Sequence, residues 1–148
     1  MIYLDTSLII SYVDEKDPRH ADAEELIESI GPEKRVISPL VLVELASVYS
    51  RASLENPLQL AFYSVELMRA EQTDIDFNEV LKQSLRLAPK LRLRTLDLLH
   101  IVACHVTKVE KFATLDKEIA SKSEIISNLL GCLLYTSDAA DEGLGVDL

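Results

Sequence analysis

The amino-acid sequence predicts an α/β fold built on a parallel sheet, because short strand-like segments run directly into helical patterns three times. Residues 2–4 (Ile-Tyr-Leu) suit a buried strand and are followed by Asp5, two hydroxyl residues and a helical apolar pattern. Residues 35–38 and 111–114 lead into helices in the same way. The carboxyl ends of parallel strands form the crevice where ligands bind, so Asp5 is expected to point into any active site.

Length and composition favour one soluble domain in a reducing cytoplasm. A chain of 148 residues buries enough surface to fold without disulfides. Its two cysteines, Cys104 and Cys132, lie in apolar runs and lack the spacing of a disulfide framework or a metal site. We predict no signal peptide, because Asp5 interrupts the N-terminus before any apolar stretch of useful length. We also predict no membrane span, because no apolar run approaches roughly twenty residues. The net charge of −10 disfavours indiscriminate nucleic-acid binding, although a local basic strip could still hold a phosphate backbone.

Helix boundaries are indicated by N-cap residues that precede a helical apolar pattern. Three of these caps are followed by proline, which suits the first helical turn. The predicted helices and their caps are residues 18–30 (Asp17), 39–52 (Ser38), 57–70 (Asn56) and a helix after Asn78 with Leu81, Leu85 and Ala88 on its buried face.

Two further strands are predicted towards the sheet edges. Residues 73–77 alternate polar and apolar side chains, as a half-buried edge strand would, and residues 124–126 could form a last strand. Beyond Ile126 the chain has no Lys or Arg, four acids and three of its four glycines. We therefore predict a functional domain over residues 1–126 and an atypical, non-native or disordered tail over residues 127–148.

Two apolar helices each carry a carboxylate among apolar side chains. Glu44 is the only charged residue between residues 40 and 48. Asp97 lies in the first turn of an apolar helix over residues 95–106, where the helix dipole favours a negative charge. Burying an unpaired carboxylate costs several kcal/mol or forces protonation, so Glu44 in particular needs a compensating cation.

Four acids are expected to meet at one end of the sheet: Asp5, Glu44, Asp97 and Asp116. Taken singly, each has a structural explanation, as a helix cap, a dipole-stabilised residue or the partner of a buried arginine. Taken together, they would repel one another unless protons or hard cations neutralised them. Oxygen ligands without a nearby Cys or His cluster favour Mg²⁺ or Mn²⁺ over Zn²⁺.

Four short motifs, in this order and spacing, resemble those of PIN domain ribonucleases, and within them the toxins of VapBC-type toxin–antitoxin pairs. The likeness covers Met1 to about Ile126. The motifs are Ile-Tyr-Leu-Asp5-Thr-Ser, Ser-Pro-Leu-Val-Leu-Val-Glu44-Leu-Ala, Thr95-Leu-Asp97-Leu-Leu-His-Ile-Val-Ala and Phe-Ala-Thr114-Leu-Asp116-Lys.

The resemblance implies a three-layer α/β/α sandwich around a parallel sheet of about five strands. It also implies that the four acids bind one or two Mg²⁺ or Mn²⁺ ions and that the protein hydrolyses RNA to leave 5′-phosphates. Thr6, Ser7 or Thr95 would support a carboxylate or a metal-bound water. The family further implies a homodimer and, for a toxin, an antitoxin partner that enters the acidic pocket.

Other charged and histidine residues leave alternatives open. The strip Arg86, Lys90, Arg92 and Arg94 is a candidate for RNA-backbone contacts, and equally for a solvated helix end. His100 lies one helical turn after Asp97, but we interpret it as a hydrogen-bonded core residue. Two further histidines, His20 and His105, form no nucleophile triad.

Two other protein classes with a similar strand-and-acid pattern fit less well. A haloacid dehalogenase type phosphatase needs a second acid two residues after the first, where this chain has Ser7. A response-regulator receiver domain has no counterpart of Glu44. The main alternative is a catalytically silent PIN-like module that binds protein or RNA, and a PIN nuclease in RNA processing is an alternative to a toxin.

Overall fold

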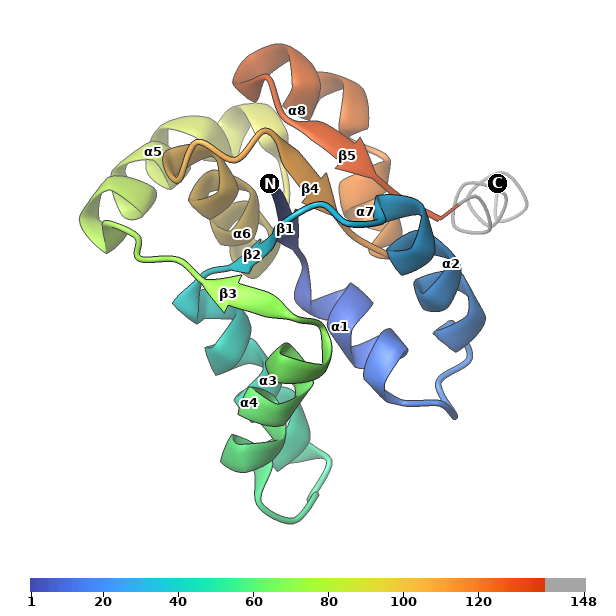
Figure 1. Ribbon diagram of the computed structural model, residues 1–148. Helices are drawn as coiled ribbons and strands as arrows, with labels where there is room; N and C mark the ends of the chain where they lie inside the picture. The colour runs from blue at the N-terminus through green and yellow to red at the C-terminus, as the bar shows by residue number, and fades with distance from the viewer. Residues whose placement is uncertain (138–148) are drawn as a thin grey trace.

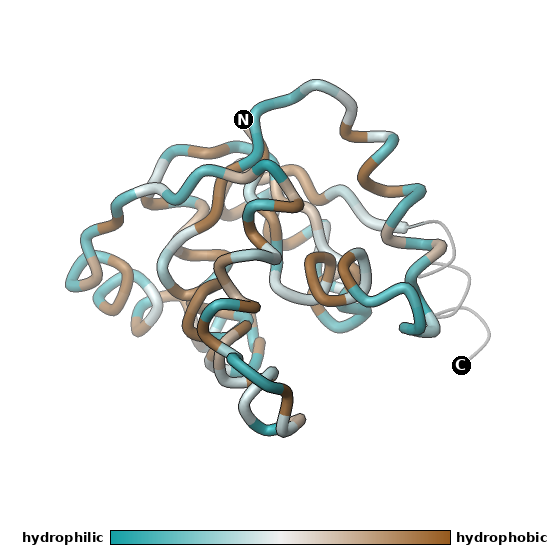
Figure 2. Tube along the Cα trace, turned by 60° about the horizontal axis from the view of Figure 1, so that its bottom comes forward, coloured by the Kyte–Doolittle hydropathy of each residue, from teal (hydrophilic) through white to brown (hydrophobic). Residues whose placement is uncertain are grey.

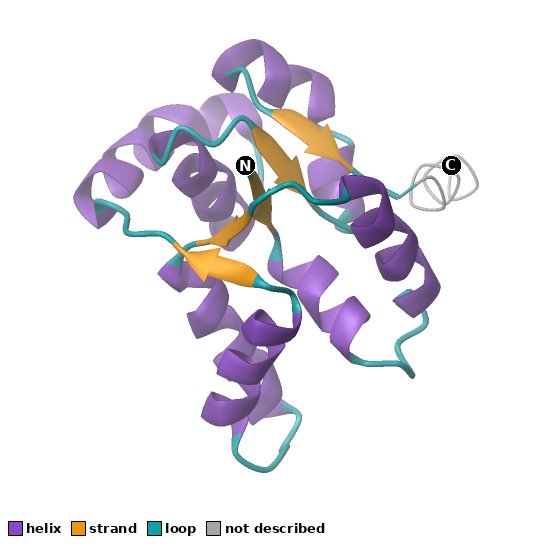
Figure 3. Cartoon of the chain, viewed as in Figure 1, coloured by secondary structure: helices purple, strands orange, loops and turns teal. Residues whose placement is uncertain are grey.

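The computed structural model describes residues 1–137, and they form one five-stranded parallel sheet in the order β3-β2-β1-β4-β5. All four strand pairings are parallel. The strands are β1 (Ile2–Leu4), β2 (Arg35–Ile37), β3 (Ala70–Gln72), β4 (Lys111–Ala113) and β5 (Leu133–Tyr135). Figure 3 shows the strands in the middle of the molecule with helices on either side.

Eight helices connect the strands within the described part of the chain. They are α1 (Thr6–Val13), α2 (His20–Ile30), α3 (Pro39–Arg51), α4 (Pro57–Leu67), α5 (Phe77–Leu91), α6 (Thr95–Val106), α7 (Lys117–Ala120) and α8 (Ser123–Leu130). In Figure 1, α1, α3 and α4 lie below the sheet, and α5, α6 and α8 lie above it. The predicted three-layer α/β/α fold is therefore confirmed. None of the described helices is long and apolar enough to cross a membrane.

The strand order places the candidate site. The chain first runs from β1 outwards to β2 and β3, then crosses back to add β4 and β5 on the other side of β1. The reversal lies between β1 and β4, where the backbone N–H of Asp5 donates to the Ala113 carbonyl at 2.9 Å. Ligands of open parallel sheets bind in the crevice at such a reversal, outside the carboxyl ends of the strands.

The core is centred on β1, whose three residues are all fully buried. The Tyr3 ring stacks on Phe112 of β4, with ring centroids 5.3 Å apart. Figure 2 shows hydrophobic residues along the central segments, while the outer helices alternate between hydrophobic and hydrophilic positions. This packing fixes the two central strands that carry Asp5 and Thr114 at their ends.

Both predicted edge strands were wrong. The strand at the β2 edge is Ala70–Gln72, and residues 73–76 form a loop that leads into α5. Residues 124–126 belong to α8, because the apolar pattern continues with helical spacing to Leu130. The last strand, β5, lies within the segment predicted as a tail, so the sheet extends past Ile126. Residues 138–148 of that predicted tail lie outside the described residues.

Several helix details also differ from the prediction. Helix α2 begins at His20 because Asp17 caps a preceding turn, accepting from the backbone N–H of Arg19 at 2.8 Å. Asp76, not Asn78, caps α5. Leu81 and Leu85 are exposed. The buried face of α5 consists instead of Val80, Ser84, Leu87 and Leu91.

Candidate functional site

Asp5 lies at the carboxyl end of β1 and serves as the N-cap of α1. Its Oδ1 accepts from the backbone N–H of Thr6 at 2.9 Å. Its Oδ2 accepts from the Ser7 hydroxyl at 2.8 Å and from the Thr114 hydroxyl at 2.7 Å. The Asp5 side chain is thus buried and held by two neighbouring strand ends. Burial raises its pKa, and the charge of His100 and these hydroxyl hydrogen bonds only partly offset that rise.

Glu44 reaches the same place from α3. Its Oε1 lies 2.8 Å from Nε2 of His100, which α6 carries and which is fully buried. Partial burial raises the pKa of Glu44, but the hydrogen bond from His100, the nearby Thr6 hydroxyl and the nearby positive charges together outweigh it, so the net pKa is lowered. Burial lowers the pKa of His100, and Glu44 and Asp5 reverse this to a net rise. The contact with His100 therefore favours the ionised carboxylate of Glu44.

Three of these side chains are close enough to share one cation. Ligand atoms of Asp5, Glu44 and His100 all lie within 4.8 Å of one another. Ligands on opposite sides of an Mg²⁺ ion lie roughly 4 Å apart, so a small adjustment would let this group surround an ion. Asp97 and Asp116 are not part of this tightest group.

Asp97 and Asp116 extend the acidic cluster outwards. Asp116 follows β4 and caps α7, accepting from the backbone N–H of Ile119 at 3.0 Å. Burial, and then the charges of Asp116 and Asp5, raise the pKa of Asp97 to about 6. The charge of Glu44 acts in the same direction. All four predicted acids therefore lie within electrostatic reach at the carboxyl end of the sheet.

The predicted supporting hydroxyls behave differently from one another. Ser7 binds Asp5 directly. The Thr6 hydroxyl lies near enough to Glu44 to lower its pKa, yet it is buried without a hydrogen bond of normal geometry. Thr95 is exposed and makes no hydrogen bond to a site carboxylate among the described residues. Thr114 was not predicted, although its place directly after β4 mirrors that of Asp5 after β1.

The basic strip touches the site only at one end. Arg94 lies 3.8 Å from Oδ2 of Asp97 and 3.4 Å from Oε2 of Glu118. The other three residues of the strip, Arg86, Lys90 and Arg92, are exposed and form no ion pair within residues 1–137.

The residues present fit a divalent cation. Oδ2 of Asp97 and the Thr6 hydroxyl are buried without a hydrogen-bond partner, which leaves their lone pairs available to an ion or its water shell. Carboxylate oxygens, with or without one imidazole, are ligands suited to Mg²⁺ and Mn²⁺. The raised pKa values of Asp5 and Asp97 indicate that the protein's own cations do not fully balance these charges.

The PIN domain family matches residues 2–125 of the chain. The structure is similar to VapC20 of Mycobacterium tuberculosis, a toxin that cleaves the sarcin-ricin loop, at a TM-score of 0.63 and 16% identity. That match covers 82% of this chain and 94% of VapC20. No curated protein sequence matches the chain.

Two toxin–antitoxin structures are similar as well. VapBC2 of Rickettsia felis, bound to DNA from its promoter, matches with a TM-score of 0.61 and 19% identity over 93% of this chain and 100% of that chain. VapBC-1 of nontypeable Haemophilus influenzae matches with a TM-score of 0.60 and 17% identity over 90% and 96%. At these identities the structures support the fold, and the family match covers most of the sequence. The chain belongs to the PIN domain family.

Proposed function

We propose that this protein is a metal-dependent endoribonuclease that hydrolyses RNA phosphodiester bonds to leave 5′-phosphates. We further propose that it is the toxin of a VapBC-type toxin–antitoxin system. One observation carries the proposal: four acids from separate parts of a PIN-domain chain gather at the carboxyl end of its sheet, where burial and neighbouring charges raise the pKa values of Asp5 and Asp97. A bound cation would offset the cost of holding these negative charges close together, so the arrangement is best explained as a set of cation ligands.

Asp5, Glu44, Asp97 and Asp116 would hold Mg²⁺ or Mn²⁺. When bound, such an ion lowers the pKa of a water molecule and neutralises charge on the leaving 3′ oxygen. Ser7 and Thr114 keep Oδ2 of Asp5 in place, so the most buried acid needs no reorganisation. Of the predicted supporting hydroxyls, Ser7 and Thr6 remain in position for this role and Thr95 does not.

Arg86, Lys90, Arg92 and Arg94 would contact the RNA backbone. Arg94 is the member of this strip that borders the acids, through its ion pair with Asp97. The net charge of −10 weakens binding elsewhere on the surface, so a local basic strip would direct a phosphate chain towards the site.

The proposed protein partners are an antitoxin and a second copy of this chain. The Rickettsia and Haemophilus structures each join a toxin to its antitoxin, which supports the first. Val43, Leu58 and Phe62 on α3 and α4 are exposed and border a pocket of about 260 Å³, an apolar face that would suit a protein interface. Two free, buried cysteines suit a reducing cytoplasm.

Asp5→Asn and Asp97→Asn test the proposal most simply. Each replacement keeps the size of the side chain and removes one charge that the cation requires. We expect Mg²⁺-dependent RNA cleavage to fall by at least about 100-fold, because a lost metal ligand removes most of the ion's contribution to the transition state. Cleavage of a labelled RNA and analysis of its 5′ ends measure the rate and the product.

Glu71→Gln is the matched control, because Glu71 is an exposed acid that pairs with Lys34 on the far edge of the sheet. It should cleave as the wild type does. Wild-type rates in both aspartate variants would reject the assignment. A folded wild type that binds Mn²⁺ but cuts no RNA would favour the silent binding module. Growth arrest relieved by a neighbouring antitoxin gene would separate a toxin from an RNA-processing enzyme.

A further inference from the structure

A chain of buried hydrogen bonds lies behind Glu44. The Tyr3 hydroxyl is 2.6 Å from Oγ of Ser38 and 3.0 Å from Nδ1 of His100. On the other side of the ring, Nε2 of His100 is 2.8 Å from Oε1 of Glu44. Ser38, Tyr3 and His100 are all fully buried and come from α3's N-cap, β1 and α6. A polar chain of this kind, with no exposure to water, is held in one arrangement by its own partners.

The hydrogens in this chain fit best in one direction. Ser38 makes no side-chain cap on α3, and Tyr3 is the one hydrogen-bond partner of its hydroxyl among the described residues. Ser38 therefore donates to the Tyr3 oxygen, because its hydrogen would otherwise be buried without an acceptor. The Tyr3 hydrogen is then free to donate to Nδ1 of His100. In that tautomer Nε2 carries the proton and donates to Oε1 of Glu44.

The same geometry disfavours His100 as a metal ligand. A ligating Nε2 must present a lone pair, which would face the carboxylate oxygen only 2.8 Å away. Nδ1 would then carry the hydrogen and donate it to the Tyr3 oxygen, and the Tyr3 hydroxyl would donate to Ser38. The Ser38 hydroxyl hydrogen would be left buried without an acceptor. With Nε2–H directed at Oε1, the second oxygen of Glu44 is left for a cation.

We propose that Ser38 and Tyr3 fix His100 as an Nε2–H donor to Glu44, so that His100 is a positioning residue for this carboxylate and not a ligand of the ion. This inference rests on the proposed function, because it assigns a role within the same metal site. Asp5, Glu44 and His100 form the tightest group of potential ligands, and the inference assigns the ion to the two carboxylates and not to His100.

The first test is made on the wild-type protein with ¹⁵N-labelled histidine. Long-range ¹H–¹⁵N spectra report which ring nitrogen carries a proton, and His100→Gln identifies the signal among the three histidines. Mg²⁺ is diamagnetic, so spectra can be compared before and after saturation. We expect Nε2 of His100 to keep its proton in both. Loss of that proton on Mg²⁺ binding would show direct ligation and overturn the inference.

The second test uses Tyr3→Phe, which removes the hydroxyl and keeps the ring that stacks on Phe112. We expect its affinity for Mn²⁺, measured by calorimetry or by the spin resonance of free Mn²⁺, to fall by up to about 10-fold. This is the low end of the loss for a direct partner of a metal ligand, because Tyr3 acts on Glu44 through His100. Tyr49→Phe is the matched control, because the Tyr49 hydroxyl also lies 2.8 Å from a buried serine, Ser64, but does not contact the acids. Its Mn²⁺ affinity should not change.

The outcomes separate this inference from the proposed function. A wild type that binds Mn²⁺ with the same affinity as Tyr3→Phe would overturn the positioning role and leave the metal site standing. A wild type that binds no Mn²⁺ would overturn both. If Tyr3→Phe does not fold, the spectra of the wild-type protein decide the question alone.

Discussion

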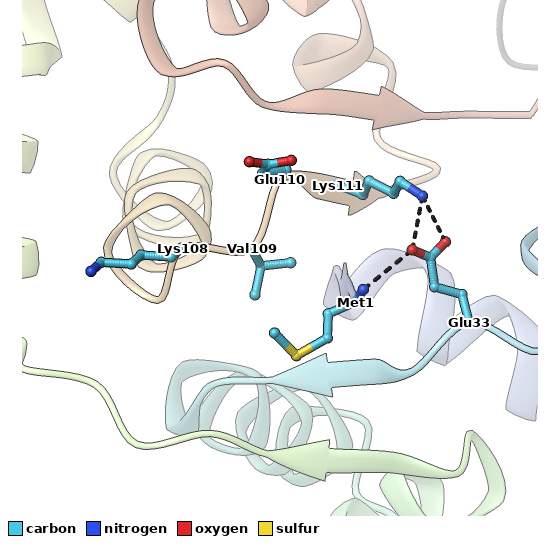
Figure 4. A pocket seen from close by; sticks show the side chains of 6 residues that line it. All are labelled: Met1, Glu33, Lys108, Val109, Glu110 and Lys111. Atoms are coloured by element: carbon cyan, nitrogen blue, oxygen red, sulfur yellow. Dashed lines mark hydrogen bonds and ion pairs between the residues drawn. The ribbon is translucent and has the colours of Figure 1, made fainter.

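The two ends of the sheet shift the pKa values of buried or paired carboxylates in different directions. At the amino end, Glu33 accepts from Nζ of Lys111 at 2.8 and 3.1 Å and from the ammonium group of Met1 at 3.2 Å (Figure 4). The hydrogen bond from Lys111 is the main reason that the pKa of Glu33 is lowered. At the carboxyl end, the pKa values of Asp5 and Asp97 are both raised. At the amino end the protein's own cations balance Glu33. At the carboxyl end His100 lowers the pKa of Glu44, but Asp5 and Asp97 are not balanced in this way.

This difference distinguishes a structural charge from a functional one. Glu33 lies beside a pocket of about 260 Å³, and two cations of the chain satisfy it. At the carboxyl end, Glu44 pairs with His100, and Asp97 pairs with Arg94, which is largely exposed. Unbalanced acids reduce stability and persist where an external ion or substrate completes the site.

The largest expected effect is stabilisation by Mn²⁺. Binding to the folded state alone should raise the free energy of unfolding by about 2.7 kcal/mol at 100 times Kd, with a matching rise in Tm. Asp5→Asn should lose this response, whereas Glu33→Gln should keep it because its partners are at the other end of the sheet. Thermal unfolding with and without Mn²⁺ measures both. If Asp5→Asn and Glu33→Gln lost the stabilisation by Mn²⁺ equally, the proposed difference between the two ends of the sheet would be rejected.

A smaller effect is expected from pH. Asp97 has a pKa of about 6 in the folded protein against 3.8 for an ordinary aspartate, so the folded state takes up the proton first as pH falls. The metal-free protein should therefore gain stability from Asp97 as pH falls from about 6 to about 4, and lose it as pH rises through the same window. A shift of this size corresponds to about 3 kcal/mol, which solvent screening reduces to about 1–2 kcal/mol.

Asp97→Asn isolates this contribution. The metal-free variant should be more stable than the wild type near neutral pH. The difference should shrink as pH falls to about 4, because Asp97 of the folded wild type becomes protonated over that range. Urea unfolding at several pH values measures the difference. A variant that is less stable than the wild type at neutral pH would mean that groups of the protein already stabilise the negative charge of Asp97.

Much of the fold could be predicted because the central strands carry strong local signals. Residues 2–4 are uniformly apolar, and Ser38-Pro39 and Asn56-Pro57 mark the starts of α3 and α4. The edges could not be predicted in this way. Strand β3 has two exposed residues of three. The apolar residues of β5 follow the apolar end of α8 with only Gly131 and Cys132 between them, so neither strand stands out as a separate pattern.

The acids of the site could be predicted, but their neighbours could not. Asp5 and Asp116 follow strands, and Glu44 stands out in an apolar helix. His100 was interpreted as a hydrogen-bonded core residue, which its burial supports, but its contact with Glu44 depends on how α3 and α6 pack. The helical spacing of Leu81 and Leu85 predicts an apolar face on α5, but spacing alone does not show whether other parts of the chain cover that face, and both side chains are exposed.

Anomalous X-ray scattering from crystals soaked in Mn²⁺ tests the central claim most directly. We predict a peak at the carboxyl end of the sheet, bounded by Asp5, Glu44 and Asp97, with His100 outside the coordination shell and no peak beside Glu33. A peak at the amino end, or none among the four acids in a protein that cleaves RNA, would contradict the claim that this cluster exists to hold a divalent cation.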